Sequence, residues 1–84
     1  MRRSGKEIEN EILRLCRDRG KEKSICPSEV CRSLDPENWR KLMPVVMEKA
    51  SDLHHQKKVR ILQKGTMVED PEKVMGPVRI QIHT

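Results

Sequence analysis

Apolar residues recur at helical spacing near the start of the chain. The first set lies on one face of a helix and consists of Ile8, Ile12, Leu15 and Cys16. The predicted helix begins after Ser4, a capping residue, and runs to about Arg19. Gly20 follows, and glycine ends helices readily because it adopts a positive φ angle without strain.

A second, shorter helix is predicted after an extended segment at residues 24–26. Pro27 suits the first position of a helix, where its missing N–H costs nothing. Glu29 falls in the first turn, where its charge complements the helix dipole. The extended segment itself is predicted to form the short first strand of a small sheet.

The third helical stretch carries an apolar stripe that a proline interrupts. The stripe consists of Leu42, Val46, Ala50 and Leu53. Because Pro44 lies inside the stripe, a single helix would kink there. The alternative, which we expect, is a short helix from Pro36 to about Leu42 and a second helix that starts near Met43. Residues 38–43 would then connect the two, and the second helix would end near His55 or Gln56.

Strict alternation of apolar and polar residues predicts two strands near the end of the chain. The residues predicted to face inward are Val59, Ile61, Val78, Ile80 and Ile82. Those predicted to face outward are Arg60, Arg79 and Gln81. The segment from Gly65 to Pro77 is predicted to be a long loop with one helical turn near Pro71 to Val74.

Together these elements predict an α+β fold, a winged helix-turn-helix with three main helices, a short strand and a two-stranded β-wing. The chain has 84 residues, which predicts a single domain over residues 1–84, with residues 1–5 and 83–84 frayed. It has no Phe or Tyr, and Trp39 is its only aromatic residue. We therefore expect Trp39 to anchor the core.

The charge is uneven along the chain. Residues 1–23 hold eight Lys or Arg and five Asp or Glu, and residues 57–84 hold six and three, so that each end carries a net charge of +3. Residues 24–56 hold four and five, a net charge of −1. A small basic protein often meets DNA or RNA, yet the middle segment, which contains the predicted helix-turn-helix, is slightly acidic.

A nucleic-acid-associated module with backbone contacts is the function that we expect. The positions expected to be exposed on the third helix are poor readers of bases, and they are Val45, Met47, Glu48, Ser51, Asp52 and His55. Basic residues flank this helix and the predicted wing, and they could bind phosphates without reading sequence. The predicted nucleic-acid-binding residues are Arg40, Lys41, Lys57, Lys58, Arg60 and Lys64.

The alternative is a protein-docking module that uses the surface from Trp39 to Met47. Met43, Val45 and Met47 could form an adaptable apolar patch, for which methionine is well suited. The sign of the charge on the third helix favours docking, whereas the net charge of the chain favours nucleic acid.

Other classes of function find little support in the sequence. The cysteines Cys16, Cys26 and Cys31 match no standard zinc spacing even when His54 and His55 are added, so we expect neither a metal nor a cofactor. No phosphate-binding loop or nucleophile motif is present, which argues against an enzyme and a small-molecule substrate. No apolar run reaches membrane-spanning length and no secretory signal is evident, so an intracellular protein, cytoplasmic or nuclear, is expected.

Several short motifs resemble a small family that is catalogued as a domain of unknown function. They are Cys26-Pro-Ser-Glu-Val30, Trp39-Arg40, Leu42-Met43-Pro44, Gln63-Lys64-Gly65 and Gly76-Pro77-Val78-Arg79. The resemblance covers roughly residues 8–82 and implies a winged-helix fold but no activity. Met47 stands where the family pattern implies a basic residue, and Cys31 stands where it implies alanine.

Overall fold

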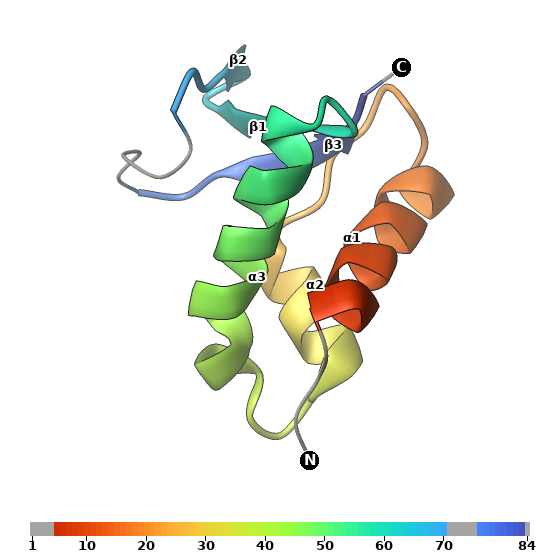
Figure 1. The fold of residues 1–84 in the computed structure, drawn as a ribbon, viewed down its shortest axis with the longest axis vertical. Coiled ribbons are helices and arrows are strands. Elements are labelled where there is room, and N and C mark those ends of the chain that lie inside the picture. Colours follow the sequence, from red (N-terminus) through yellow and green to blue (C-terminus); the bar gives the residue numbers. More distant parts are fainter. Residues whose placement is uncertain (1–4, 71–75, 84) are drawn as a thin grey trace.

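Three helices pack side by side, and a small antiparallel sheet lies across one end of them (Figure 1). The computed structural model describes residues 5–70 and 76–83. The helices are α1 (Gly5–Arg19), α2 (Pro27–Leu34) and α3 (Trp39–His55), and the strands are β1 (Val59–Gln63), β2 (Thr66–Met67) and β3 (Arg79–Ile82). The predicted α+β class is confirmed. The predicted cap at Ser4 and helical turn near Pro71 to Val74 lie outside the described residues.

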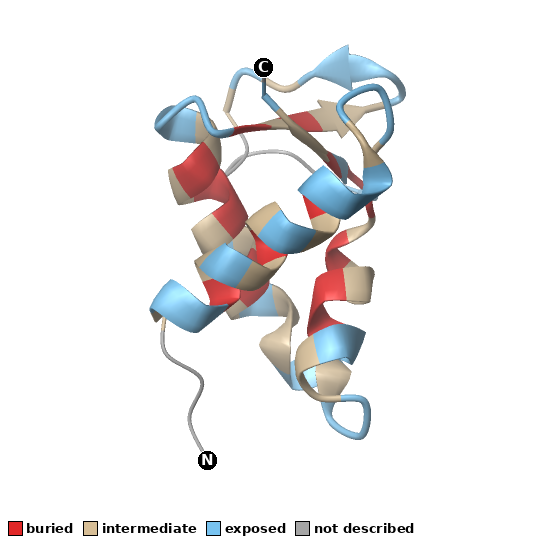
Figure 2. Cartoon of the chain, turned by 90° about the vertical axis from the view of Figure 1, so that its right-hand side faces the viewer, coloured by how far each residue is buried: buried red, intermediate tan, exposed pale blue. Residues whose placement is uncertain are grey.

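The core lies where the helices meet the inner face of the sheet (Figure 2). Its buried residues are Ile8, Ile12, Cys16, Ile25, Val30, Cys31, Val46, Ala50, Leu53, Val59, Ile61, Val78 and Ile80. These side chains come from every described helix, from β1 and β3, and from the segments before α2 and β3. Burial of apolar surface therefore joins these parts, whereas both residues of β2 are exposed. The predicted inward positions of the sheet agree with this set except Ile82, which is half-buried.

The boundaries of α1 and α2 follow the predicted signals. Gly20 ends α1 with a φ angle of 108°. Pro27 opens α2, and the backbone N–H of Cys26 donates to Glu29 Oε2 at 2.6 Å. Glu11 binds α1 to α2, since it accepts hydrogen bonds from Arg14 at 2.7 and 2.9 Å and from the Ser33 hydroxyl.

In the described residues the sheet has three strands, whereas the sequence predicted a two-stranded wing and a separate short first strand. Their order is β2-β1-β3, and the predicted pairing of β1 with β3 is present. The additional strand, β2, folds back on β1 through Lys64 and Gly65, which have φ angles of 54° and 81°. Two positive φ angles in succession match the right-handed twist of a tight hairpin, so the chain turns where we predicted a long loop. The segment predicted as a short strand forms a single bridge, Ile25 with Ile80.

Helix α3 is continuous, and the predicted handover from one helix to another near Pro44 is wrong. Pro44 is exposed and is the sixth residue of α3. Because proline has no backbone N–H, the helix lacks one backbone hydrogen bond, and this bond is missing near the start of the helix. The buried stripe of Val46, Ala50 and Leu53 holds the rest of the helix against the core. Burial along one face therefore outweighs the cost of the proline.

Two side chains of α3 lie elsewhere than expected. Trp39 is half-buried at the edge of the core, and the guanidinium carbons of Arg32 and Arg40 lie 4.5 and 4.7 Å from its ring centroid. It is not the central anchor that we predicted. Ser51, expected to be exposed, is only 2% exposed, and its hydroxyl has no hydrogen-bond partner among the described residues.

The Ser51→Ala variant is expected to be more stable than the wild type by roughly 1 kcal/mol. The change removes an unpaired buried hydroxyl and introduces a better helix former. Chemical denaturation followed by circular dichroism measures the difference. Ser33→Ala is the matched control, since it makes the same chemical change in a helix but removes the hydrogen bond to Glu11, and we expect it to lower stability. A destabilised Ser51→Ala protein would contradict the assignment of an unpaired hydroxyl.

His54 links the end of α3 to the first sheet strand. Its Nδ1 accepts a hydrogen bond from the backbone N–H of Ile61 at 3.1 Å. Burial lowers the pKa of His54 from its ordinary 6.5, and the nearby His55 and His83 lower it further. The fold therefore favours the neutral ring, which alone can accept this hydrogen bond.

The pH dependence of stability follows from this shift. The unfolded chain binds a proton at His54 more readily than the folded one, so the contribution is fully present above pH 6.5 and is lost as the pH falls below that value. We expect the free energy of unfolding to decrease as the pH falls from about 7.5 to about 5.5. In His54→Asn, whose amide oxygen can accept the same hydrogen bond, this decrease should be smaller. His55→Asn serves as the control, and an unchanged slope in His54→Asn would refute the assignment.

Candidate functional site

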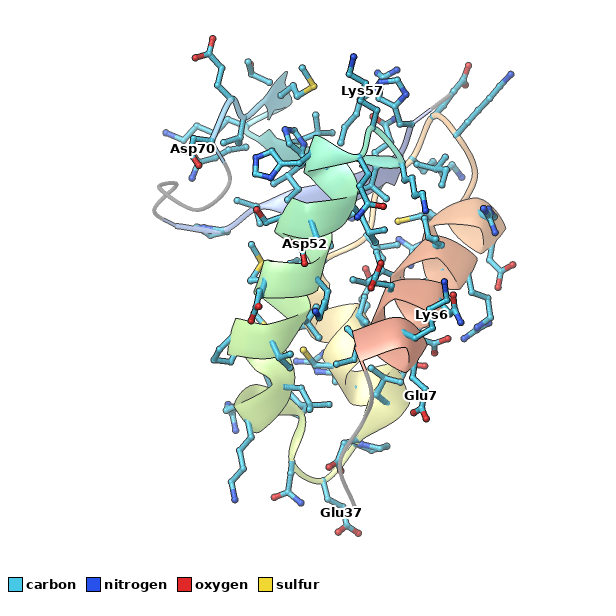
Figure 3. All side chains as sticks on the ribbon, in the orientation of Figure 1. Lys6, Glu7, Glu37, Asp52, Lys57 and Asp70 are labelled. Atoms are coloured by element: carbon cyan, nitrogen blue, oxygen red, sulfur yellow. The ribbon has the colours of Figure 1, made fainter. Side chains whose placement is uncertain are left out.

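The structure divides the six predicted basic residues into two groups. Arg40 and Lys41 lie at the start of α3. The other four residues lie beyond the end of α3, Arg60 within β1 and Lys57, Lys58 and Lys64 next to its two ends. A helix of 17 residues is about 25 Å long. The two groups are thus at opposite ends of the molecule, as the positions of Glu37 and Lys57 in Figure 3 make clear. They cannot form one continuous patch.

The group around β1 is placed by the alternation of the strand. Val59 and Ile61 point into the core, so Arg60 and Leu62 point out. In the register of the sheet, Arg60 lies opposite Gln81, and Leu62 lies opposite Arg79. Neither β1 nor β3 contains an acidic residue. We call the surface of Lys58, Arg60, Lys64, Arg79 and Gln81 the basic sheet face.

Lysines with unusual backbone conformations stand at the two ends of β1. Lys57 has a φ angle of 62° and Lys64 one of 54°, both in the region that non-glycine residues seldom adopt. Lys57 turns the chain out of α3 and Lys64 turns it toward β2. Both side chains are exposed, so these turns extend the positive charge beyond the strand.

Arg79 also belongs to the basic sheet face. The sequence predicted that it faces outward but not that it contributes to a binding surface. Its Nε donates to the Ser24 hydroxyl at 2.6 Å and its Nη2 to the Ser24 carbonyl at 2.8 Å. Its Nη1 donates to Cys26 Sγ at 3.0 Å. The guanidinium is exposed yet held in place, so its charge has a defined position. Since 55 residues separate Arg79 from Ser24, no local signal could have predicted the contact.

The loop between α1 and α2 also joins the face. Gln81 Nε2 donates to the carbonyl oxygen of Lys21 at 2.9 Å, which brings residues 21–23 beside β3. Lys21 and Lys23 are exposed, and Glu22 between them offsets part of their charge.

Helix α3 offers few groups that could read bases. Glu48 is exposed, and Asp52 is half-buried with its Oδ2 3.8 Å from Lys49 Nζ. Ser51 faces the core instead of the solvent. His55 remains an exposed polar side chain near the end of the helix. Acidic side chains on this surface would repel phosphates.

The three apolar residues named for the docking alternative, Met43, Val45 and Met47, are half-buried. Met43 and Met47 line an open groove of about 360 Å³, together with Cys26, Pro27 and Val78. Cys31 Sγ donates to Met43 Sδ at 3.4 Å, so one of the two thioethers is already in contact with the core. Val45 does not line this groove.

Two of the three thiols, those of Cys16 and Cys31, are buried. Burial raises the pKa of Cys16 to about 11, and it also raises the pKa of Cys31. In the described ranges, no three His, Cys, Asp or Glu residues come together in a way that could hold a metal ion. None of the helices within those ranges is long and apolar enough to cross a membrane.

Comparison with known proteins identifies the family of the chain but no activity. Among curated proteins, no sequence matches it. A family model described as "Protein of unknown function (DUF3253)" matches residues 5–83, which is nearly the whole chain. This match agrees with the resemblance seen in the sequence motifs. The chain therefore belongs to the DUF3253 family of proteins of unknown function.

Proposed function

We propose that this protein is a winged-helix module that holds nucleic acid by its phosphate backbone. The order of its elements supports the fold assignment: α1, an extended segment bridged to β3, the pair α2 and α3, and then the antiparallel strands. In helix-turn-helix proteins, the second helix of the motif meets the major groove. In this chain that helix is α3, and the hairpin of β1 and β2 would form part of the wing.

The basic sheet face is the observation that carries the proposal. It gathers four Lys or Arg side chains around two strands that contain no acidic residue, with the lysines of residues 21–23 alongside. Phosphates are spaced a few ångströms apart along a strand of DNA or RNA, so several cations on one surface can contact them together. Such contacts position a protein without specifying a sequence.

The composition of α3 makes base reading a minor part of the proposed binding. Direct readout needs Arg, Lys, Asn or Gln side chains directed at base edges. The exposed surface of α3 beyond its first turn offers Glu48 and His55 instead. Arg40 and Lys41, which we also expected to bind nucleic acid, lie too far from the basic sheet face to act in the same contact. We therefore propose a binding module with weak sequence preference and no catalytic role.

Reversing two charges on this face should abolish binding. In Lys58→Glu with Arg60→Glu, we expect no measurable affinity for a labelled DNA duplex in fluorescence anisotropy at low salt. The control is Lys6→Glu with Arg17→Glu, which makes the same change in net charge on exposed positions of α1 and should retain most of the affinity. Neutralising the same two residues with glutamine should instead leave weak binding, whose log–log salt slope is smaller by about 1.8.

Two outcomes would overturn this proposal. Equal losses in the α1 control and in the sheet variant would mean that only net charge matters. Absence of binding to every DNA and RNA tested at low salt would leave the docking module as the better function. Met47→Ala adds a further check, because the proposal expects almost unchanged nucleic-acid affinity in that variant.

A further inference from the structure

A second cluster of cations surrounds Trp39, the first residue of α3. The start of α3 lies at the end of the molecule remote from the sheet (Figure 1). Arg32 comes from the last turn of α2, and Arg40 follows Trp39 in α3. Their guanidinium carbons lie 4.5 and 4.7 Å from the centroid of the indole ring, well within the range of a cation–π interaction. Both arginines are exposed, while Trp39 is half-buried.

These cations have no acidic partners within the part of the chain that the structure describes. Neither Arg32, Arg40 nor the adjacent Lys41 forms a salt bridge there. The nearest acids in sequence are Asp35, whose Oδ1 accepts a hydrogen bond from the backbone N–H of Asn38, and the exposed Glu37. Three cations against two acids leave a positive surface.

The local position of these charges is unfavourable for α3 itself. The first turn of the helix contains no acidic residue, and the Asn38 side chain makes no capping hydrogen bond. Cations near a helix N-terminus oppose the dipole. The helix dipole therefore repels Arg40 and Lys41, and an anionic partner would offset this repulsion.

We propose that Arg32, Trp39 and Arg40 form a docking site for an acidic segment of a partner protein. A guanidinium that lies over an indole ring keeps its N–H edge free, and this edge matches a carboxylate with two parallel hydrogen bonds. The ring restricts each arginine in advance, which reduces the entropy lost on binding. Tryptophan and arginine are also the residue types that most often dominate the binding energy of protein interfaces.

The same geometry disfavours a nucleic acid at this site. Single-stranded bases bind by stacking on an open aromatic face. Here two guanidinium groups already lie over the indole, so a base would have to displace one of them. The first turn of α3, which carries Trp39 and Arg40, also lies about 25 Å from the lysines that follow the other end of this helix. The site is thus independent of the function proposed above.

The test uses a short fluorescein-labelled peptide in which pairs of glutamates alternate with single leucines. We expect it to bind the full chain at low salt and to shift the NMR signals of the Trp39 indole N–H and of the Arg32 and Arg40 side chains. A peptide with glutamine in place of glutamate should not bind. Arg32→Gln with Arg40→Gln should weaken binding by at least about tenfold, because two charge-assisted contacts are lost.

Matched variants separate the proposed geometry from charge alone. Arg32→Lys with Arg40→Lys keeps both charges but loses the planar fork, and it should weaken binding by about threefold. Lys6→Gln with Arg17→Gln removes the same charge from α1 and should change the affinity little. The backbone NMR spectrum of each variant reports whether it is folded, and all four positions are exposed.

Three results would overturn the proposal. The first is a peptide that does not bind at low salt. The second is binding that depends on Lys58 and Arg60 rather than on Arg32 and Arg40. The third is a single-stranded DNA oligomer that shifts the Trp39 indole signal and displaces the labelled peptide more effectively than the unlabelled peptide does. That result would assign the cluster to nucleic acid.

Discussion

The rest of the structure depends on one row of three isoleucines across the sheet. Ile25 and Ile80 exchange two backbone hydrogen bonds of 2.8 and 2.7 Å, and Ile80 also lies opposite Ile61. All three side chains are fully buried. The row joins the segment before α2, strand β3 and strand β1, although Ile25 and Ile80 are far apart in the sequence. It also fixes which side chains face outward, because a shift by one residue would turn the arginines of the sheet into the core.

Local sequence patterns predicted the helix boundaries that one glycine or proline determines, and the strand pairing that alternation determines. Gly20 and Pro27 mark the boundaries of α1 and α2, and the alternation around Ile61 and Ile80 gives the pairing of β1 with β3. Patterns failed where packing decides the outcome. The continuity of α3 through Pro44 depends on the buried face beyond it. The hairpin that forms β2 depends on Lys64 taking a positive φ angle, for which a Lys-Gly pair is only a weak signal.

The candidate site was predictable to the extent that it follows from strand alternation. Arg60 and the flanking lysines of β1 are read from the sequence, since they border residues that must be buried. The contribution of Arg79 depends on its contact with Ser24, and that of residues 21–23 on Gln81, so both require the long-range pairing of β3. The arginine contacts of Trp39 were missed for a different reason. Composition alone suggested that the only aromatic side chain would be central, but the core is filled by Ile, Val, Leu, Ala and Cys side chains.

The position of Trp39 has a consequence for how this protein can be observed. As the only tryptophan, it is the dominant source of intrinsic fluorescence, and it reports on the junction of α2 and α3 rather than on the sheet. Nearby guanidinium charges make its emission sensitive to any change in how those side chains stack. Loss of the emission signal during unfolding would therefore time the opening of the helical end of the molecule. The sheet would need its own probe, for which the backbone amides of β1 and β3 are suited.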